Sequence, residues 1–497
     1  MELSVVFSRA MMGFDAPLVR VETHLSNGLP AFHIVGMPET AVRESKDRVR
    51  SALLNSHFSF PDRRITVSLA PADLPKEGGR FDLPIALGIL SASGQLPADR
   101  LAEHEFLGEL ALDGSLREVP GSICAALAAT ESKRKLVLAH SAASVTANTP
   151  GSQVLGSPDL LTLCAHLNGS RPLQPTPPAP PGNGPAMPDL GDVVGQAGAR
   201  RALEIAAAGG HHLLFTGPPG TGKTLLASRL PGILPPPSAD EVLTSLALAN
   251  MRGATPLGQA VTLQRPFRSP HHSASAAALA GGGSRPQPGE ISLAHGGVLF
   301  LDELPEFNRS CLEALREPLE AGQITLPRAN STYTYPASFQ LVAAMNPCPC
   351  GFLGDAQQAC RCSPTQVQRY RNKISGPLLD RIDLHVQVDR LPPAQLLDPA
   401  QDNESSAEVQ ARVSATRQRQ VQRQGCSNNR LSPDRLFQLA GLEASEKRTL
   451  EQAATRLHLS GRALHRTLRV ALTIADLAGL ERVTTDHVSE ALAYRRW

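Results

Sequence analysis

Alternating apolar and polar residues mark the first third of the chain. They run through Arg64–Leu69 and Lys135–Ala139, and this pattern predicts strands of a sheet with a buried face. The segment Glu39–Ser56 has instead the spacing of an amphipathic helix. The mixture predicts an α+β domain over residues 1–170.

Farther along, helical patterns alternate with buried strands. Ala199–Ala208 is predicted to be a helix and His212–Thr216 a buried strand, and the glycine-rich loop after that strand opens another helix. This order is typical of a parallel α/β sheet, which we expect over residues 189–390.

Strand patterns end at about residue 390. A connector rich in glutamine and arginine, residues 391–430, leads to a small helical lid domain expected over residues 431–497. Its helical patterns are Pro433–Leu439, Ala444–Leu457, Gly461–Ala478 and Thr485–Tyr494.

A proline-rich linker separates the first domain from the rest. Residues 171–188 contain eight prolines and few side chains able to pack, which predicts an extended, semi-rigid spacer.

Composition excludes several classes of protein. The chain has 497 residues with 48 basic and 46 acidic side chains, and this balance excludes a globally basic nucleic-acid binder. No run approaches the roughly 20 apolar residues that span a bilayer, and the N-terminal residues lack a basic region before a long apolar stretch, so we expect no signal peptide. We therefore expect a cytoplasmic protein without a membrane partner. The one strongly basic stretch, residues 411–430, holds five arginines and no acidic residue. It is either a solvated helix face or a phosphate contact.

One phosphate-binding motif fits its pattern in full. The stretch Gly217–Thr224 matches G-x-x-x-x-G-K-[ST] between an apolar strand and a helix. In such a loop backbone N–H groups converge on phosphate oxygens, Lys223 supplies charge to the β- and γ-phosphates, and the Thr224 hydroxyl is placed to ligate Mg²⁺. We therefore predict ATP and Mg²⁺ as cofactors. The nucleotide-binding candidates are Gly217, Pro218, Pro219, Gly220, Thr221, Gly222, Lys223, Thr224 and Leu225.

A second acidic motif follows some 75 residues later. The apolar strand Gly297–Leu301 ends in Asp302 and Glu303. We expect Asp302 to hold Mg²⁺ through water and Glu303 to polarise the attacking water, which predicts hydrolysis rather than nucleotide storage.

A further apolar strand, Phe339–Met345, ends in Asn346, whose side chain is placed to orient the same water. With these motifs the chain resembles the AAA+ ATPases, in which Asn346 matches the sensor-1 position. The resemblance implies that Arg381, in the run Gly376–Asp383, is an arginine finger that reaches the γ-phosphate bound by the next subunit. It therefore implies a ring, expected to be a hexamer.

Two smaller matches belong to the same resemblance. Val194, Gly195 and Gln196 fall in a segment similar to the adenine-side motif of the superfamily. Arg462 is similar to the sensor-2 arginine of the helical lid. For Arg381 and Arg462 alike, a solvated surface charge is the alternative.

Longer stretches narrow the resemblance. Three stretches look like the magnesium-chelatase-like ATPases, namely Pro266–Ser273, Gly281–Gly297 and Asn346–Gly351. The whole chain resembles the ComM (YifB) branch, including Glu77–Pro84 and Gly461–Arg466. This family resemblance implies a motor that drives branch migration of DNA in homologous recombination during natural transformation. The implied partners are branched or single-stranded DNA without sequence specificity, further copies of the chain in a homo-hexamer, and recombination proteins.

Two insertions are candidates for DNA contact. The glycine-rich stretch 281–291 contains Arg285 and predicts a loop or hairpin, and 322–335 alternates like a hairpin that carries Arg328, Tyr333 and Tyr335. Arginine and tyrosine can contact or stack on a strand without reading its sequence. A solvated hairpin tip is the alternative.

Four cysteines lie close together in the chain. Cys348, Cys350, Cys360 and Cys362 form two C-x-C pairs, and four thiolates so close predict a structural, tetrahedral Zn²⁺ site. The C-x-C spacing is tighter than usual, and reduced thiols without a metal are the alternative.

The first domain resembles the proteolytic domain of Lon proteases in Leu74–Asp82 and Gly108–Arg117. That family uses a serine activated by a lysine, but Arg80 stands where the nucleophile would be, and Leu116–Thr130 contains no lysine. We expect a non-proteolytic scaffold. A chelatase-type motor that remodels a protein partner and, less favoured, a Lon-like ATP-dependent peptidase remain the alternative functions.

Overall fold

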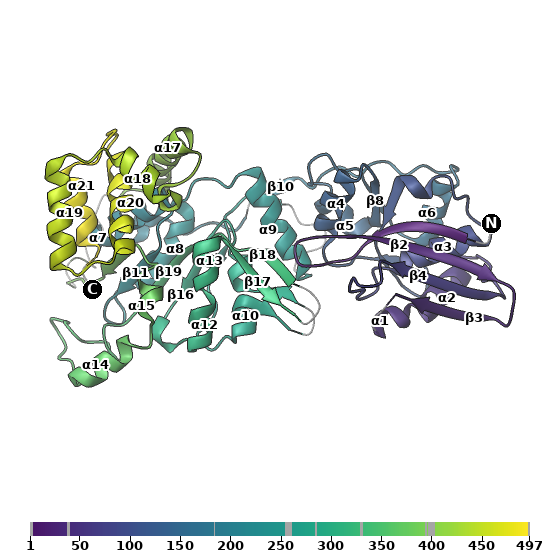
Figure 1. Cartoon of the computed structure of the whole chain (residues 1–497), viewed down its shortest axis with the longest axis horizontal. Coiled ribbons are helices and arrows are strands. Elements are labelled where there is room, and N and C mark those ends of the chain that lie inside the picture. Colours follow the sequence, from purple (N-terminus) through teal and green to yellow (C-terminus); the bar gives the residue numbers. More distant parts are fainter. Residues whose placement is uncertain are drawn as a thin grey trace.

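The computed structural model describes residues 3–36, 40–182, 184–253, 261–283, 286–328, 332–392, 395 and 403–495. The chain is elongated, with the first domain at one end, the C-terminal helices at the other and a second sheet between them (Figure 1). Among the described helices, none combines the length and the apolar character needed to span a bilayer.

A mixed sheet organises the first domain. Within the described residues its strand order is β3-β4-β2-β1-β5-β8-β9, antiparallel for β1–β2 and β2–β4 and parallel elsewhere. The strands are β1 (Leu3–Arg9), β2 (Leu18–Ser26), β3 (Ala31–Val35), β4 (Arg64–Ala70), β5 (His104–Phe106), β8 (Lys135–Ala139) and β9 (Val154–Ser157). A small hairpin joins β6 (Glu109–Leu110) and β7 (Leu116–Arg117). The predicted strands at 64–69 and 135–139 are confirmed.

Helices cover this sheet. They are α1 (Thr40–Arg43), α2 (Ser45–Asn55), α3 (Asp82–Ala92), α4 (Ser122–Glu131), α5 (His140–Thr146) and α6 (Leu160–Leu167), with the 3₁₀ turn η1 (Leu101–Glu103). The single helix predicted over 39–56 is therefore divided into α1 and α2. Every residue of α3 is buried, so this helix forms the centre of the domain core.

The proline-rich segment is extended, but it is not a free spacer. The Thr176 N–H donates to Val154 O at 2.8 Å and the Ala179 N–H to Ser144 O at 2.8 Å. The short strand β10 (Pro181–Gly182) then pairs with β12 (Val261–Thr262). N–H groups between the prolines attach the segment to the first domain, and the Pro180 carbonyl accepts the Val261 N–H at 3.1 Å from the following part of the chain.

The second sheet has the predicted parallel α/β form. Its order is β13-β16-β19-β11-β20, with every pair parallel. The strands are β11 (Leu213–Thr216), β13 (Phe267–Arg268), β16 (Val298–Leu301), β19 (Gln340–Met345) and β20 (Leu384–Gln387). Because all five run the same way, their carboxyl ends meet at one edge of the sheet, where α/β proteins place ligands.

Helices and two hairpins surround this sheet. The helices are α7 (Ala197–Gly209), α8 (Lys223–Ile233), α9 (Ala239–Met251), α10 (Ala276–Ala280), α11 (Glu290–Leu293), α12 (Arg309–Ala314), α13 (Arg316–Ala321), α14 (Pro364–Arg371) and α15 (Gly376–Leu379), with turns η2 (Leu190–Asp192) and η3 (Leu304–Glu306). The predicted hairpins are confirmed as β14 (Gly281–Gly282) with β15 (Gln287–Pro288) and β17 (Gln323–Pro327) with β18 (Thr332–Pro336).

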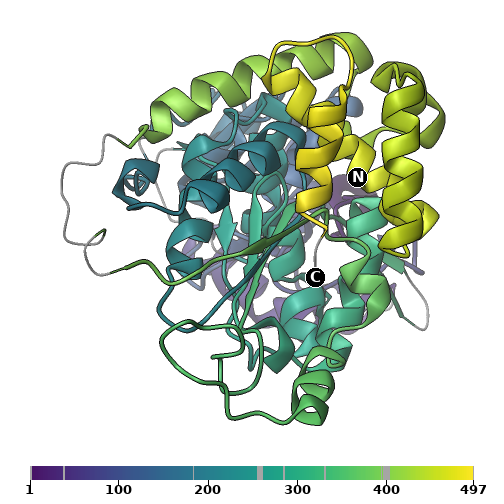
Figure 2. The ribbon, with the colours of Figure 1, turned by 90° about the vertical axis from the view of Figure 1, so that its left-hand side faces the viewer.

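The C-terminal part is helical, as predicted. It comprises α17 (Ser406–Gln424), η4 (Asn428–Arg430), α18 (Pro433–Ala440), α19 (Ala444–Arg456), α20 (Gly461–Leu477) and α21 (Thr485–Ala493). Figure 2 shows these helices together on one side of the core, with the long helix α17 across the top. The sequence did not predict α17 as an element, although its buried Val409 and Val413 belong to the same core as α7 and α8.

Of the five arginines in residues 411–430, Arg417 and Arg423 attach the helix to the fold, while Arg412, Arg419 and Arg430 are exposed. Arg417 donates to the carbonyl oxygens of Ala207 (2.8 Å) and Ala208 (2.9 Å) near the end of α7. Arg423 forms a salt bridge with the buried Asp476 at 2.7 Å. The idea that this stretch is a phosphate contact is therefore wrong for these side chains, because helix carbonyls and a carboxylate already occupy their donors.

A buried ionic cluster joins the sheet to the C-terminal helices. Asp383, 1% exposed, accepts the His212 N–H at 2.9 Å and pairs with Arg466 of α20 at 2.8 Å. The Gln340 side chain of β19 donates to His211 O at 2.7 Å. Arg466 is the foremost cause holding the pKa of Asp383 well below its usual value, in spite of burial.

Buried histidines make this fold sensitive to acid. Burial lowers the pKa of His212 and of His385 to about 4, against about 6.5 in an unfolded chain. Between these two pKa values the unfolded chain binds more protons than the folded chain. The contribution of the two neutral histidines to the free energy of unfolding is therefore fully present above about pH 6.5 and declines toward pH 4. Each histidine contributes up to about 3 kcal/mol to this decline.

We therefore expect the urea midpoint of unfolding to fall from about pH 7 to about pH 5. His212 Nδ1 accepts the Leu341 N–H at 3.1 Å, and the amide of a His212→Gln variant can accept it without titrating. In that variant the urea midpoint should change less between pH 7 and pH 5. A change as large as that of the wild type would contradict the assignment of acid sensitivity to His212.

Candidate active site

The phosphate-binding loop lies between β11 and α8. Gly220 and Gly222 have positive φ values of 76° and 89°, which glycine adopts without strain. Lys223 begins α8, and its Nζ donates to Gly217 O and Pro218 O, both at 2.7 Å, and to Asn346 Oδ1 at 3.2 Å. Burial lowers the pKa of Lys223. The first N–H groups of α8 open toward this loop, as in other anion sites at helix N-termini.

Two carboxylates lie opposite the loop, at the end of β16. Asp302 Oδ2 accepts the Thr224 hydroxyl at 2.7 Å, so one hydroxyl and one carboxylate oxygen are adjacent. Oxygen donors of this kind suit Mg²⁺, which binds through one or two protein oxygens plus phosphate oxygens and water. The donor set therefore fits the predicted magnesium site.

Glu303 is held in an unusual conformation. Its φ is 52°, a left-handed value that is uncommon for a residue with a side chain. Its Oε2 lies 3.0 Å from Nδ1 of His272, and its side chain is 55% exposed. No role for His272 is predicted from the sequence. The sequence feature that could have indicated a role is the position of His272 shortly after β13. β13 pairs with β16 in parallel, so residues that follow these two strands lie close together at the same edge of the sheet.

The structure brings five of the predicted hydrolytic residues, Lys223, Thr224, Asp302, Glu303 and Asn346, together in one cleft of about 430 Å³. Its lining consists of Pro219, Gly220, Thr221, Gly222, Lys223, Thr224, Asp302, Glu303 and Asn346. The cleft thus combines an ammonium group, a hydroxyl adjacent to a carboxylate, a second carboxylate and an amide.

The predicted adenine-side residues lie next to this loop. The Gln196 side chain donates to Asp389 O, beyond β20, at 2.8 Å. Gly195 has a φ of 59°, and an added Cβ there would lie 3.2 Å from Leu391. Val194 is half-buried, and Leu225 is 40% exposed at the start of α8.

Arg381 and Arg462 are not in the cleft of their own chain. Arg381 is 6% exposed and donates to Pro377 O at 2.6 Å and to Glu320 Oε1 at 2.5 Å. Arg462 has a 72% exposed side chain and lies 3.7 Å from the same Glu320 oxygen. In the single chain Glu320 and a helix carbonyl hold the Arg381 guanidinium, and its predicted contact with the γ-phosphate of the next subunit stays a prediction.

The tyrosines of the β17–β18 hairpin are not available to stack on DNA. Tyr333 and Tyr335 are 7% and 0% exposed. They pair in register with Leu326 and Ile324, so the alternation of the strand places them on the apolar face. The Tyr335 hydroxyl donates to the carbonyl oxygen of Pro286 at 2.8 Å. Their prediction as DNA contacts is wrong in this arrangement.

The same hairpin contacts the first domain. The Phe14 N–H donates to Thr334 O at 3.3 Å, and on the neighbouring helix α9 the Asn250 side chain accepts the Ser122 hydroxyl at 3.2 Å. Of the basic candidates, Arg328 is exposed and donates to Gly283 O. Arg285 lies outside the described residues.

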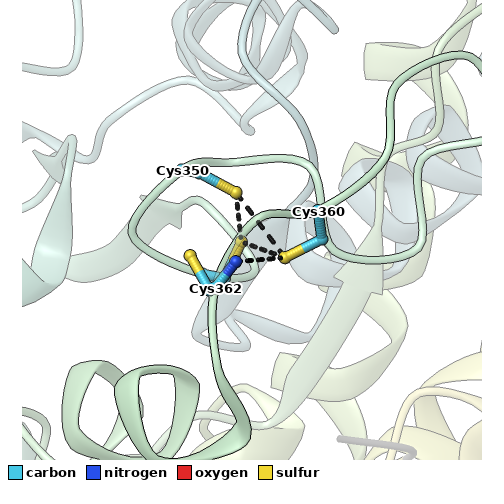
Figure 3. Close-up of side chains that lie close together, drawn as sticks. Cys350, Cys360 and Cys362 are labelled. Atoms are coloured by element: carbon cyan, nitrogen blue, oxygen red, sulfur yellow. Dashed lines mark hydrogen bonds between the residues drawn. The ribbon is translucent and has the colours of Figure 1, made fainter.

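The four cysteines form one compact cluster. Sγ of Cys348 lies 3.4 Å from Sγ of Cys350 and 3.6 Å from Sγ of Cys360, and the ligand atoms of all four cysteines lie within 4.8 Å of one another. Figure 3 shows Cys350, Cys360 and Cys362 gathered within one loop. Backbone hydrogen bonds from Phe352 and Arg361 lower the pKa of Cys350, which favours its thiolate.

Comparison with known proteins places all three parts of the chain in one family. Residues 189–396 match the family model for magnesium chelatase, subunit ChlI, residues 21–142 that for subunit ChlI of Mg-chelatase, and residues 403–495 that for the ChlI C-terminal region.

Full-length relatives agree with these matches. The chain is 50% identical to competence protein ComM of Haemophilus influenzae, over 100% of this chain and 98% of that protein. It is 50% identical to the uncharacterised protein YifB of Escherichia coli, over 100% and 97% of the two chains. An uncharacterised Mycobacterium tuberculosis protein is 43% identical over 100% and 99%. The chain belongs to the ComM/YifB family of magnesium-chelatase-like AAA+ proteins, a membership that implies ATPase activity.

Proposed function

We propose that this chain is a cytoplasmic, hexameric motor that uses ATP and Mg²⁺ to move branch points in DNA during homologous recombination in natural transformation. The observation that carries the proposal is the cleft formed by Lys223, Thr224, Asp302, Glu303 and Asn346. It occurs in a chain that is similar over its full length to a competence protein. A structural Zn²⁺ in the four-cysteine cluster is part of the proposal.

Five side chains of the cleft have roles in the proposed hydrolysis. Lys223 offsets charge on the β- and γ-phosphates, and Thr224 and Asp302 supply oxygens toward Mg²⁺, which offsets phosphate charge when bound. Glu303 accepts a proton from the attacking water, and His272 beside it orients the carboxylate. Asn346, next to Lys223, orients the same water.

The proposed ring is supported by the position of two arginines. Arg381 and Arg462 lie together at Glu320, outside their own cleft. In the proposed hexamer they face the nucleotide of the adjacent subunit, where a guanidinium stabilises charge on the γ-phosphate.

Basic loops are the proposed DNA contacts. Arg328 at the end of β17 and Arg285 in the β14–β15 loop remain the candidates, and six copies of each would surround a pore. We propose the first domain to be a Lon-like, non-proteolytic scaffold. Arg80, at the position of the Lon nucleophile, is buried and donates to Pro120 O at 2.7 Å.

A chelatase-type motor acting on a protein partner is the second candidate, because all three matching family models describe chelatase subunits. Branched DNA separates the two functions. We expect DNA to stimulate the ATPase and the wild type to migrate a synthetic branched substrate, whereas Glu303→Gln should not. A wild type that hydrolyses ATP but neither responds to DNA nor migrates it would contradict the DNA proposal and favour the chelatase type.

The roles of Lys223 and Glu303 predict different defects. Lys223→Ala should weaken ATP binding at least about tenfold, since the phosphates lose their charge partner. Glu303→Gln should keep ATP binding but lower kcat about 100-fold or more, the usual contribution of a general base. Titration with a fluorescent ATP analogue and steady-state hydrolysis measure the two effects.

Glu306→Gln is the matched control for that experiment. Glu306 is an exposed carboxylate three positions beyond Glu303, paired with Lys373 at 3.1 Å. Hydrolysis by this variant should remain at the wild-type level. Equal losses in Glu303→Gln and Glu306→Gln would show that the general-base assignment is incorrect.

Mixing variants tests whether Arg381 acts on its neighbour. Lys223→Ala and Arg381→Ala subunits should each be inactive alone, but a mixed ring contains interfaces that join an intact Lys223 to an intact Arg381. We therefore expect the mixture to hydrolyse ATP faster than the sum of its components. Activity no greater than that sum would contradict action across the interface.

A further inference from the structure

The four-cysteine cluster has the dimensions of a metal site. A tetrahedral Zn²⁺ with Zn–S bonds of about 2.3 Å places its sulfurs about 3.8 Å apart. The Sγ–Sγ distances among Cys348, Cys350 and Cys360 are 3.4, 3.6 and 3.6 Å. A disulfide would require about 2.05 Å, and all four cysteines are free.

The loop that holds these cysteines has no regular secondary structure. Residues 346–363 are all described, and none of them lies in a helix or strand. Loops of this length without regular structure are uncommon in compact domains, and a bound metal closes such loops effectively. The thiols form a closed set of four, which is typical of a structural rather than a catalytic ion.

Both ends of the loop lead to parts of the ATP site. Cys348 is two positions beyond Asn346, at the end of β19. At the other end, Ser363 caps α14 directly after Cys362. Tyr370 of that helix is buried and hydrogen-bonds to the backbone of Asn346. Asn346 is therefore connected to the cluster through the chain on one side and through α14 on the other.

The loop also packs on the phosphate-binding loop. A Cβ added to Gly351 would lie 2.7 Å from Cδ of Pro219 and 3.9 Å from Cγ of Asn346, so the backbone at Gly351 lies close against the Pro219 ring and the Asn346 side chain. Asn346 in turn accepts a hydrogen bond from Lys223 at 3.2 Å. A shift of the cysteine loop would thus displace Asn346 and the P-loop relative to each other.

We propose that a divalent, thiophilic ion bound by Cys348, Cys350, Cys360 and Cys362 makes Asn346 competent for catalysis, so that occupancy of this site sets the rate of ATP hydrolysis. The inference rests on the proposed ATPase function and adds a control of its rate. The cysteines act as positioning residues, because the loop that carries them lies against Pro219 and Asn346 through Gly351, and the cysteines do not contact the nucleotide.

The first experiment compares Cys360→Ser with Cys426→Ser. Cys426 is free, half-buried and outside the cluster, so it matches the substitution without touching the site. We expect one zinc per chain in the wild type and in Cys426→Ser, and loss of zinc in Cys360→Ser. The kcat of Cys360→Ser should fall at least about tenfold, since small displacements of catalytic groups have effects of this size. Binding of a non-hydrolysable ATP analogue should be retained.

A double-mutant cycle tests whether the bound ion affects hydrolysis through Asn346. If the ion acts through Asn346, then Asn346→Ala and Cys360→Ser together should lower kcat no more than the more damaging single substitution. Fully additive losses would overturn the proposed route.

Metal exchange in the wild-type chain avoids the risk that a variant misfolds. Removing zinc with a chelator should lower kcat, and adding Co²⁺ should restore it together with the absorption bands of tetrahedral cobalt thiolate. A zinc content far below one per chain, or an unchanged kcat without metal, would overturn the inference. If the wild type hydrolyses no ATP at all, the proposed function fails, while the metal content and the cobalt spectrum still report on the site.

Discussion

Parallel pairing of β11, β16 and β19 is the constraint on which the active site depends. Met345 pairs with Thr216, so β11 and β19 end at the same level, and Leu301 pairs with Ala343, so β16 ends two residues before them at the same edge of the sheet. The loops that follow them have to begin side by side. Residues separated by more than 120 positions in the chain, such as Lys223 and Asn346, therefore come within hydrogen-bonding distance. A change of register in any one strand would separate them.

The C-terminal helices are attached to the same sheet at the amino-terminal ends of its strands. Asp383 precedes β20 and is buried with His211 and Arg466, so the lid and the sheet share one ion pair. Removing one partner of such a pair costs about 3–5 kcal/mol, because a charge is left buried without compensation. The helical part is thus attached to the opposite edge of the sheet from the nucleotide cleft, and motions of the lid reach β11 and β20 directly.

Local patterns predicted much of this structure from the sequence, but tertiary contacts decided the rest. The strand–loop–helix order around Gly217–Thr224 and the strand ending at Asp302 place the cleft correctly, because each depends on short-range periodicity. Period-2 alternation also predicted the β17–β18 hairpin. It does not indicate which face is covered, and the first domain covers the face of Tyr335. The role of His272 depends on which strands are neighbours, a long-range property.

The burial of Arg381 changes how a ring would use it. Arg381 and Arg462 share a single carboxylate, that of Glu320, whose side chain is 49% exposed and therefore binds them weakly. A γ-phosphate offers more charge and more acceptor oxygens than one carboxylate, so in the proposed ring exchange of Glu320 for phosphate is favourable once a neighbour approaches. Until then Glu320 keeps Arg381 in one conformation, which reduces the side-chain entropy lost when the interface forms. Glu320 is thus better understood as a holder of the arginine before assembly than as a competitor that blocks it.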